Sequence, residues 1–171
     1  RMFDLRATLG ELFPRAYFHL GFPSPALSPH LELGQLGESH VARRLRAAGW
    51  RILAQNALAP SGEIDLVALQ GSTLVLVEVK SGLWPIGRRE RDPRTQRWRP
   101  GHRFQYEQFE TYRRALPQMR ARLPQGLAHE ARIDLIEVLW RHASWSPAII
   151  HHVDLRAPLP RSTPGHGGEN S

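Results

Sequence analysis

The stretch 63–80 limits the possible folds of this chain more than any other. It contains two runs rich in Val, Leu and Ile, separated by Gly71-Ser72. A two-residue loop that begins with glycine is typical of a type II′ β-hairpin. This loop predicts that Val67 faces Leu76 across the hairpin. A loop spanning 70–73 gives the same pairing, whereas a loop one residue longer or shorter than that would shift it.

The predicted pairing brings charged side chains together at the open end of the hairpin. Because side chains alternate along a strand, Glu63, Asp65, Glu78 and Lys80 share one face, with Asp65 opposite Glu78 and Glu63 opposite Lys80. Directly opposed like charges destabilise a strand pair by about 0.2–1 kcal/mol, and by more when they are partly buried. A divalent cation would remove this penalty. Oxygen ligands of this kind suit Mg²⁺ or Mn²⁺.

The apolar side chains of the hairpin divide between its two faces. Four of them join the charged face, namely Val67, Leu69, Leu74 and Leu76. Five take the other face, namely Ile64, Leu66, Val75, Val77 and Val79. We therefore expect a hairpin that is covered on both faces.

The hairpin alone leaves a second interpretation open. Glu63 and Lys80 would form a surface ion pair, and Asp65 and Glu78 would face water. The choice of lysine favours the site, because Lys80 is the only lysine among the 23 basic residues of the chain. Arg and Lys are not interchangeable where a compact, titratable charge is needed.

The whole sequence predicts one α/β domain with extensions at both ends. Its 171 residues are 41% apolar, which supports a single core. We assign 1–33 to an N-terminal extension, 34–156 to the domain and 157–171 to a disordered tail. No membrane-length apolar run and no secretory signal segment is legible, and cysteine is absent. These features predict a cytoplasmic protein that does not enter a membrane.

The periodicity of the apolar residues predicts how helices and strands follow one another. Val41, Leu45 and Ala48 form a helical stripe that ends before Gly49, and Glu38 lies one turn before Val41. A carboxylate beside the core either joins a site or is stabilised by the helix N-terminus. We expect helices over 33–48 and 104–123, the second kinked or ended by Pro117, and further strands over 50–57, 129–139 and 148–155.

A basic segment rich in arginine and tryptophan follows the hairpin. With a net charge of +7, the chain favours a polyanionic partner, although an arginine-rich composition gives the same charge. The segment is a candidate nucleic-acid clamp, because arginine binds phosphate and tryptophan stacks on bases; the alternative is a solvated loop. Its candidate contact residues are Arg88, Arg89, Arg91, Arg94, Arg97, Trp98, Arg99 and Arg103.

Two further groups of titratable residues predict structure rather than chemistry. Asp134 and Glu137 are an odd number of residues apart, so on a strand they face opposite sides. We interpret Asp134 as a partner of Arg132 or another arginine. His151 and His152 also face opposite sides, and no zinc ligand set accompanies them.

The order of acids, lysine, helices and strands resembles the restriction-endonuclease-like nucleases that carry the PD-(D/E)xK motif. More specifically, the chain resembles the YraN-like family of small bacterial proteins. The similar stretches cover roughly 34–155. They read Gly34-Gln-Leu-Gly37-Glu38, Gly49-Trp50-Arg-Ile-Leu, Asn56, Gly62-Glu63-Ile-Asp65-Leu-Val, Val77-Glu78-Val-Lys80 and Arg132-Ile-Asp134.

The resemblance implies a central mixed β-sheet flanked by helices, and a role for each matched residue. Asp65 and Glu78, with the Val79 carbonyl, would hold one or two Mg²⁺ or Mn²⁺ ions. Lys80 would position a water molecule or stabilise developing charge. Glu38, which archaeal Holliday-junction resolvases share on their first helix, would complete the metal shell, and Glu63 would tune Lys80.

The chain departs from the family pattern where the family carries further basic residues. Leu58 and Ser81-Gly82 stand where arginines are usual, and His102 or Arg103 is nearest to a usual lysine. These departures affect the grip on substrate rather than metal binding. The resemblance implies hydrolysis of phosphodiester bonds in DNA, with branched or flapped DNA as one option. A homodimer would suit an enzyme that cuts junctions, and the sequence shows no interface for it. The alternative is a non-catalytic nucleic-acid-binding module with a vestigial site.

Overall fold

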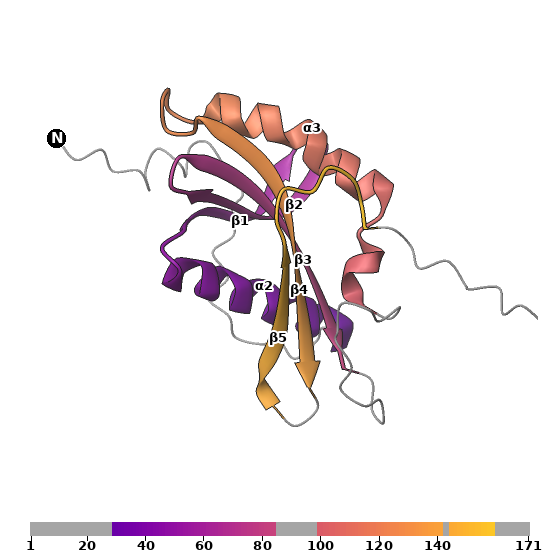
Figure 1. The fold of residues 1–171 in the computed structure, drawn as a ribbon. Coiled ribbons are helices and arrows are strands. Elements are labelled where there is room, and N and C mark those ends of the chain that lie inside the picture. Colours follow the sequence, from indigo (N-terminus) through magenta and orange to yellow (C-terminus); the bar gives the residue numbers. More distant parts are fainter. Residues whose placement is uncertain (1–28, 85–98, 142–143, 160–171) are drawn as a thin grey trace, which may run out of the picture.

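The computed structural model of the protein describes residues 29–84, 99–141 and 144–159. They form a mixed β-sheet with helix α2 on one face and helix α3 on the other (Figure 1). The elements are α2 (Pro29–Ala47), β1 (Arg51–Ala59), β2 (Gly62–Gln70), β3 (Thr73–Leu83), the 3-10 helix η2 (Pro100–Arg103), α3 (Tyr106–Arg122), β4 (Glu130–Arg141) and β5 (Ser144–His152). The predicted α/β architecture is confirmed.

The order of the strands in the sheet follows their order in the chain, β1-β2-β3-β4-β5. Neighbouring strands are antiparallel except β3 and β4, which run parallel from Thr73↔Glu130 to Leu83↔Trp140. A parallel pair requires a long crossover. Here the crossover contains η2 and α3, which places α3 over the same strands that carry the predicted acids.

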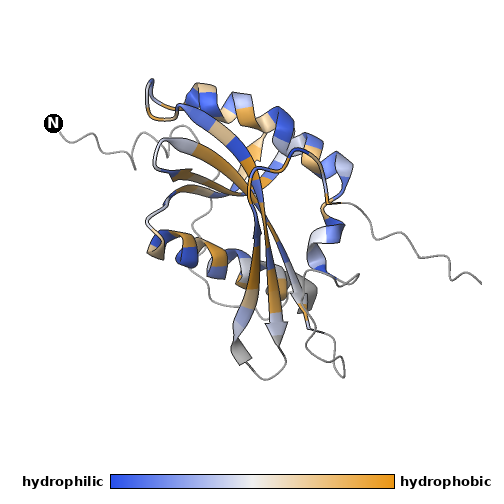
Figure 2. Ribbon diagram, in the orientation of Figure 1, coloured by the Kyte–Doolittle hydropathy of each residue, from blue (hydrophilic) through white to orange (hydrophobic). Residues whose placement is uncertain are grey.

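The core consists of two apolar layers, one on each side of the sheet. The layer under α3 contains Phe104, Tyr112 and Met119, and the layer under α2 contains Val41 and Leu45. Figure 2 shows apolar residues concentrated along the strands, while both helices carry polar residues as well. The sheet is therefore covered on both faces, as its continuous apolar strands require.

Helix α2 ends in a Schellman motif at Gly49, before which the sequence predicts the helix to end. Gly49 has a φ of 84°, which glycine adopts without steric cost. The Trp50 N–H donates to the Leu45 carbonyl at 3.0 Å, and the Gly49 N–H donates to the Arg46 carbonyl at 3.0 Å. This turn directs the chain from α2 straight into β1.

The hairpin has the predicted register over its closed part. Pairs run from Gln70↔Thr73 to Leu66↔Val77, and Val67 faces Leu76. Gly71 has a φ of 58° and is the only loop residue with positive φ, which fits a type II′ turn. Beyond Leu66 the two strands separate. The prediction that Asp65 and Glu78 pair in the ladder is therefore wrong.

Several element boundaries differ from the sequence-based expectations. Helix α3 continues through Pro117, which lies on its exposed side, because Ala115 and Met119 on either side stay buried against the sheet. Strand β5 begins at Ser144 and includes Pro147. Proline is tolerated there because β5 is an edge strand.

Parts of the sequence-based analysis concern residues outside this description. They are the N-terminal residues 1–28, most of the basic segment at 85–98, and residues 160–171 of the predicted tail. Among the helices that the structure describes, none has the length and apolar character needed to cross a membrane.

Candidate active site

The candidate site lies where β2 and β3 separate. Asp65 replaces the missing ladder bonds with two others: its Oδ2 accepts the Val79 N–H at 2.7 Å, and its own N–H donates to the Tyr112 hydroxyl at 3.0 Å. The carboxylate is thereby fixed between β2 and the end of β3. The site therefore lies inside the sheet, at the level where β2 and β3 no longer pair.

Glu78 is the most enclosed acid of the site, with 1% of its surface exposed. Its Oε1 accepts the Gln108 side-chain N–H at 3.0 Å and forms an ion pair with the Lys80 amino group. The Tyr112 hydroxyl, which accepts the Asp65 N–H, donates its own proton to Glu78. Two residues of α3 and one of β3 therefore hold this carboxylate.

The site carries more negative charge than its partners neutralise. Burial raises the pKa of Asp65 well above its usual range, and the charges of Glu78 and Glu38 raise it further. Burial also raises the pKa of the Tyr112 hydroxyl, followed by the charges of Asp65 and Glu78. A positive charge placed among these groups would lower these pKa values again.

Glu38 approaches the acids from α2, on the other side of the sheet from Tyr112. Burial raises its pKa from 4.5 to about 7, and the charge of Glu63 adds to this, while a hydrogen bond from the Asn56 side chain opposes it. Gly37 permits the approach, because a Cβ built there would lie 1.7 Å from Ser81 Oγ. The backbone of α2 therefore packs directly on β3 beside Lys80.

Glu63 occupies a different place from the one predicted. Its side chain is exposed on β2, and within the described residues Lys80 pairs with Glu78 instead. The physical reason is the separation of the strands, which carries the end of β3 away from Glu63. Its negative charge raises the pKa of Glu38.

Ile64 is a second correction. It packs in the α3 layer with Val67, although alternation predicts opposite faces for the two residues. Leu66 lies in the α2 layer as predicted, as do Val75, Val77 and Val79. The alternation of β2 is thus interrupted at Asp65.

The ligands available at this site are oxygen atoms. The carboxylates of Asp65 and Glu78 flank Val79, whose carbonyl completes the predicted set. Across residues 29–84, 99–141 and 144–159, no three His, Cys, Asp or Glu side chains are grouped closely enough to hold a metal by themselves. Magnesium usually binds through one or two carboxylates together with water and substrate phosphate, so this donor set fits Mg²⁺ or Mn²⁺.

The two described arginines of the basic segment have different environments. Arg99 is buried, with 5% of its surface exposed, and its guanidinium pairs with Glu137. This corrects its assignment to a nucleic-acid contact. Arg103 is exposed, and its guanidinium donates to the Ser81 carbonyl, next to Lys80. The remaining candidates, Arg88, Arg89, Arg91, Arg94, Arg97 and Trp98, lie outside the described residues.

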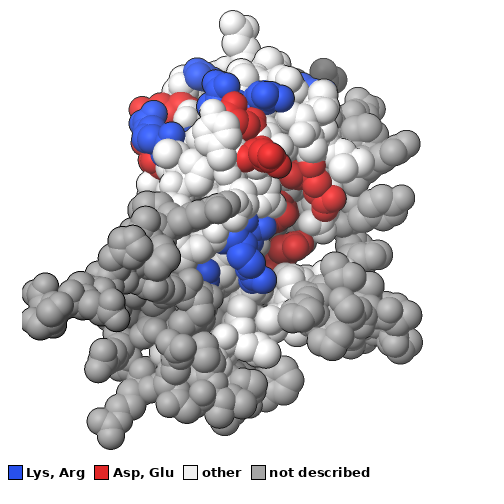
Figure 3. All heavy atoms as spheres, turned by 90° about the vertical axis from the view of Figure 1, so that its right-hand side faces the viewer, with Lys and Arg blue, Asp and Glu red and all other residues white. Residues whose placement is uncertain are grey.

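Figure 3 views the molecule from the side where η2 lies and α3 begins. Acidic side chains gather across the middle of this face, and a basic group lies beside them. Exposed charged residues of η2 and α3 include Arg103 and Glu107. A negatively charged substrate would meet this face only with help from cations, whether a metal ion or these basic side chains.

Asp134, Glu137 and the two neighbouring histidines, which the sequence predicts to be structural, form ion pairs and hydrogen bonds within the fold. Asp134 accepts the Arg132 Nε–H at 2.9 Å, interacts with His151 at 2.9 Å, and is fully buried. His152 contacts Glu137 instead, at 2.7 Å. The two histidines therefore face different acids, as their alternation predicts.

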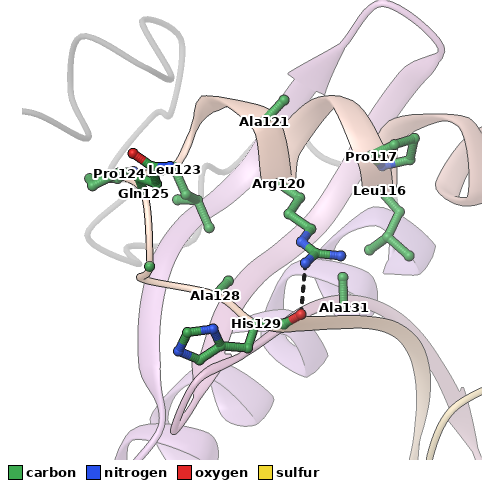
Figure 4. A pocket seen from close by; sticks show the side chains of 11 residues that line it. Leu116, Pro117, Arg120, Ala121, Leu123, Pro124, Gln125, Ala128, His129 and Ala131 are labelled. Atoms are coloured by element: carbon green, nitrogen blue, oxygen red, sulfur yellow. Dashed lines mark hydrogen bonds between the residues drawn. The ribbon is translucent and has the colours of Figure 1, made fainter.

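A cavity of about 720 Å³ lies away from the acids, at the C-terminal end of α3 (Figure 4). Its lining is mainly apolar and includes Leu116, Leu123 and Ala128. The Arg120 guanidinium crosses it to donate to the His129 carbonyl at 2.7 Å. None of the site acids lines this cavity, so we place no chemistry there.

Three site residues were not predicted as such. Gln108 and Tyr112 are four residues apart on α3, which places both on one helix face, and this spacing was a usable signal. Asn56 was part of the family resemblance, but its role was not legible, because it depends on a backbone conformation that sequence does not show.

The mixed sheet between two helical layers, with Asp65, Glu78 and Lys80 at the point where two strands separate, defines a protein with a restriction-endonuclease-like core. The chain belongs to the uncharacterised protein family UPF0102, whose model matches residues 37–138.

Individual relatives carry the same description. A UPF0102 protein of Syntrophus aciditrophicus is 49% identical over 55 residues, covering 32% of this chain and 43% of the relative. One of Renibacterium salmoninarum is 53% identical over 51 residues, covering 30% and 43%. One of Synechococcus sp. is 41% identical over 68 residues, covering 38% and 51%. The chain thus spans about half or less of the length of each relative.

Proposed function

We propose that the protein is a divalent-metal-dependent nuclease that hydrolyses phosphodiester bonds in DNA. The observation that carries this proposal is the convergence of Asp65, Glu78 and Lys80 where β2 and β3 separate. Two acids that repel one another are held in a largely buried place by hydrogen bonds from Val79, Gln108 and Tyr112. Such an arrangement is costly for stability alone, and it suits a site that takes up a cation.

Each side chain has a role that its position supports. Asp65 and Glu78, with the Val79 carbonyl, would hold Mg²⁺ or Mn²⁺, which when bound would polarise the scissile phosphate and acidify a water molecule. Lys80 would stabilise the charge that develops on the phosphate. Glu38 reaches the same place from α2 and would orient the attacking water.

The substrate class follows from charge and from the exposed side of the site. The net charge of the chain is +7, and exposed Arg103 lies beside Lys80 at the rim. Arginine at that position would bind a phosphate adjacent to the scissile one. DNA with branches or flaps, and a homodimer that would act on it, stay predictions.

A second candidate function has its own supporting observation. Glu78 is already paired with Lys80 and hydrogen-bonded to Gln108, so part of the acidic charge is neutralised within the protein. This favours a nucleic-acid-binding module whose site no longer cleaves. The two candidates differ in their response to metal and in turnover.

Metal binding is tested by thermal unfolding with and without Mn²⁺. At a Mn²⁺ concentration about 100-fold above Kd, we expect the Tm of the native protein to rise by about 5–10 °C. Asp65→Asn retains an acceptor for the Val79 N–H but loses the charge, so its Tm should not respond. The matched control is Glu107→Gln, an exposed acid on α3, which should respond like the native protein. An equal response of Asp65→Asn would contradict the proposed ligand set.

Cleavage then separates the enzyme from the binding module. We expect Mn²⁺-dependent cutting of labelled duplex, flap or junction DNA, lost in Lys80→Ala and also in Lys80→Arg, because the guanidinium is larger and planar. Metal binding without cutting of any of these substrates would favour the binding module.

A further inference from the structure

Asn56 has an unusual backbone conformation in the middle of strand β1. Among the described residues, Asn56 and Asp154 are the non-glycine residues with positive φ, at 50° and 55°. This conformation costs an ordinary residue about 1–2 kcal/mol. Asparagine and aspartate tolerate it better than the other non-glycine residues do. A strained residue within a strand is a reason to look for function there.

The strain coincides with the site. Gln55 pairs with Leu66 and Ala57 pairs with Ile64, so Asn56 lies opposite Asp65. Alternation is interrupted at this level in both strands. Ala54 and Ala57 lie in the same apolar layer, as do Ile64 and Val67, although each pair is three residues apart. The left-handed Asn56 therefore lies where the alternation of both strands is interrupted, opposite Asp65.

The Asn56 side chain connects this irregularity to α2. Its amide hydrogen-bonds the Glu38 carboxylate, and this bond acts against the burial and the acidic neighbours that raise the pKa of Glu38. Glu38 comes from a different layer of the fold than Asp65 and Glu78. Between the helix and the sheet, the carboxylate needs a donor that keeps it directed at the other acids.

We propose that Asn56 is a positioning residue, whose left-handed backbone and side-chain amide together hold the Glu38 carboxylate at the site formed by Asp65 and Glu78. Asparagine suits this position because it tolerates the backbone and also supplies an N–H donor. The contact with Glu38 stands independently of catalysis, whereas its effect on metal binding rests on the function proposed above.

The experiment compares glycine substitutions at the two left-handed positions. Glycine adopts positive φ without cost, so Asn56→Gly preserves the backbone and removes only the amide. Asp154→Gly is the matched control, because Asp154 has the same conformation but its side chain pairs with Arg156 on the surface. Both variants should unfold within a few degrees of the native protein.

The first measurement concerns the contact and needs no metal. In a ¹H–¹⁵N spectrum, we expect Glu38→Ala to shift the Asn56 side-chain amide signals and to speed their exchange with solvent. Glu107→Ala, which removes an exposed acid of α3 that does not act on Glu38, should leave those signals in place. Unchanged Asn56 signals in Glu38→Ala would overturn the inference.

The second measurement concerns the site. We expect the Mn²⁺ concentration that gives half of the Tm rise to increase about tenfold in Asn56→Gly and to be unchanged in Asp154→Gly, since loss of a residue that orients a ligand typically weakens metal affinity by 10–100-fold. An unchanged midpoint in Asn56→Gly would also overturn the inference. A native protein without any Mn²⁺ response would instead contradict the proposed function, and the spectrum would still decide the contact.

Discussion

At the scale of single residues, Tyr112 contributes most to holding the site together. Its fully buried hydroxyl accepts the Asp65 N–H and donates to Glu78, so one oxygen atom joins both acids to α3. The ring meanwhile packs against Phe104, with the ring centroids 5.7 Å apart. A single side chain thus serves the core with its ring and the polar cluster with its tip.

Replacing this hydroxyl should be costly. We expect Tyr112→Phe to lower the free energy of unfolding by about 1–3 kcal/mol, because the Asp65 N–H loses its partner in a buried place. Urea denaturation measures the effect. Tyr106→Phe is the control, since Tyr106 is 67% exposed and its change should stay within about 0.5 kcal/mol. Equal effects at both positions would show that the Tyr112 hydroxyl holds nothing in place.

At the scale of elements, the short helix η2 is fixed to the sheet by one buried acid. Glu137 accepts the Gly101 N–H at 2.8 Å and pairs with Arg99 and His152. These contacts lower its pKa from 4.5 to about 2, although burial acts in the opposite direction. Glu137 also lies beside Lys80 in the β3–β4 pairing. This anchor therefore places η2, with Arg103, at the rim of the site.

The anchor depends on the absence of a side chain at Gly101. A Cβ there would lie 2.5 Å from Glu137 Cδ, so we expect Gly101→Ala to destabilise the protein by about 1–3 kcal/mol. Gly34→Ala in α2 provides the comparison. Nothing lies within 4 Å of that position, and alanine should stabilise the helix by about 0.5–1 kcal/mol. The two variants, compared by urea denaturation, should move in opposite directions; a neutral Gly101→Ala would argue against the anchor.

At the scale of the whole molecule, the half-buried Glu38 and the buried Glu137 give stability opposite dependences on pH. The pKa of Glu38 is raised to about 7, so the native state binds more protons than the unfolded state between pH 4.5 and 7, and stability falls as pH rises through that window. The pKa of Glu137 is lowered to about 2, so its contribution is lost as pH falls from 4.5 to 2. Without metal, these two acids favour maximal stability near pH 4.5, where the two windows meet.

Glu38→Gln isolates the upper window. The native protein should lose up to about 3 kcal/mol relative to Glu38→Gln between pH 4.5 and 7.5, because the variant has no carboxyl to ionise there. Urea denaturation at several pH values measures this difference. A difference that is constant with pH would mean that Glu38 ionises normally and is not enclosed among the other acids.

The sequence predicted most where the chain pairs locally and least where distant elements meet. Gly71-Ser72 determined the register as far as Leu66↔Val77, because turn geometry and alternation act over a few residues. The separation beyond Leu66 was not predicted, since the Asp65 N–H there bonds to Tyr112, which is distant in sequence. The left-handed Asn56 and the burial of Arg99 depend likewise on neighbours from other elements.

The candidate site gathers side chains from three layers, with Glu38 below the sheet, Asp65 and Glu78 within it, and Gln108 and Tyr112 above it. No layer alone contains the complete set. A partly unfolded form that has released either helix should therefore be inert, which would confine any hydrolytic action to intact molecules. A metal ion bound by the acids would in turn link the three layers and slow the detachment of either helix from the sheet.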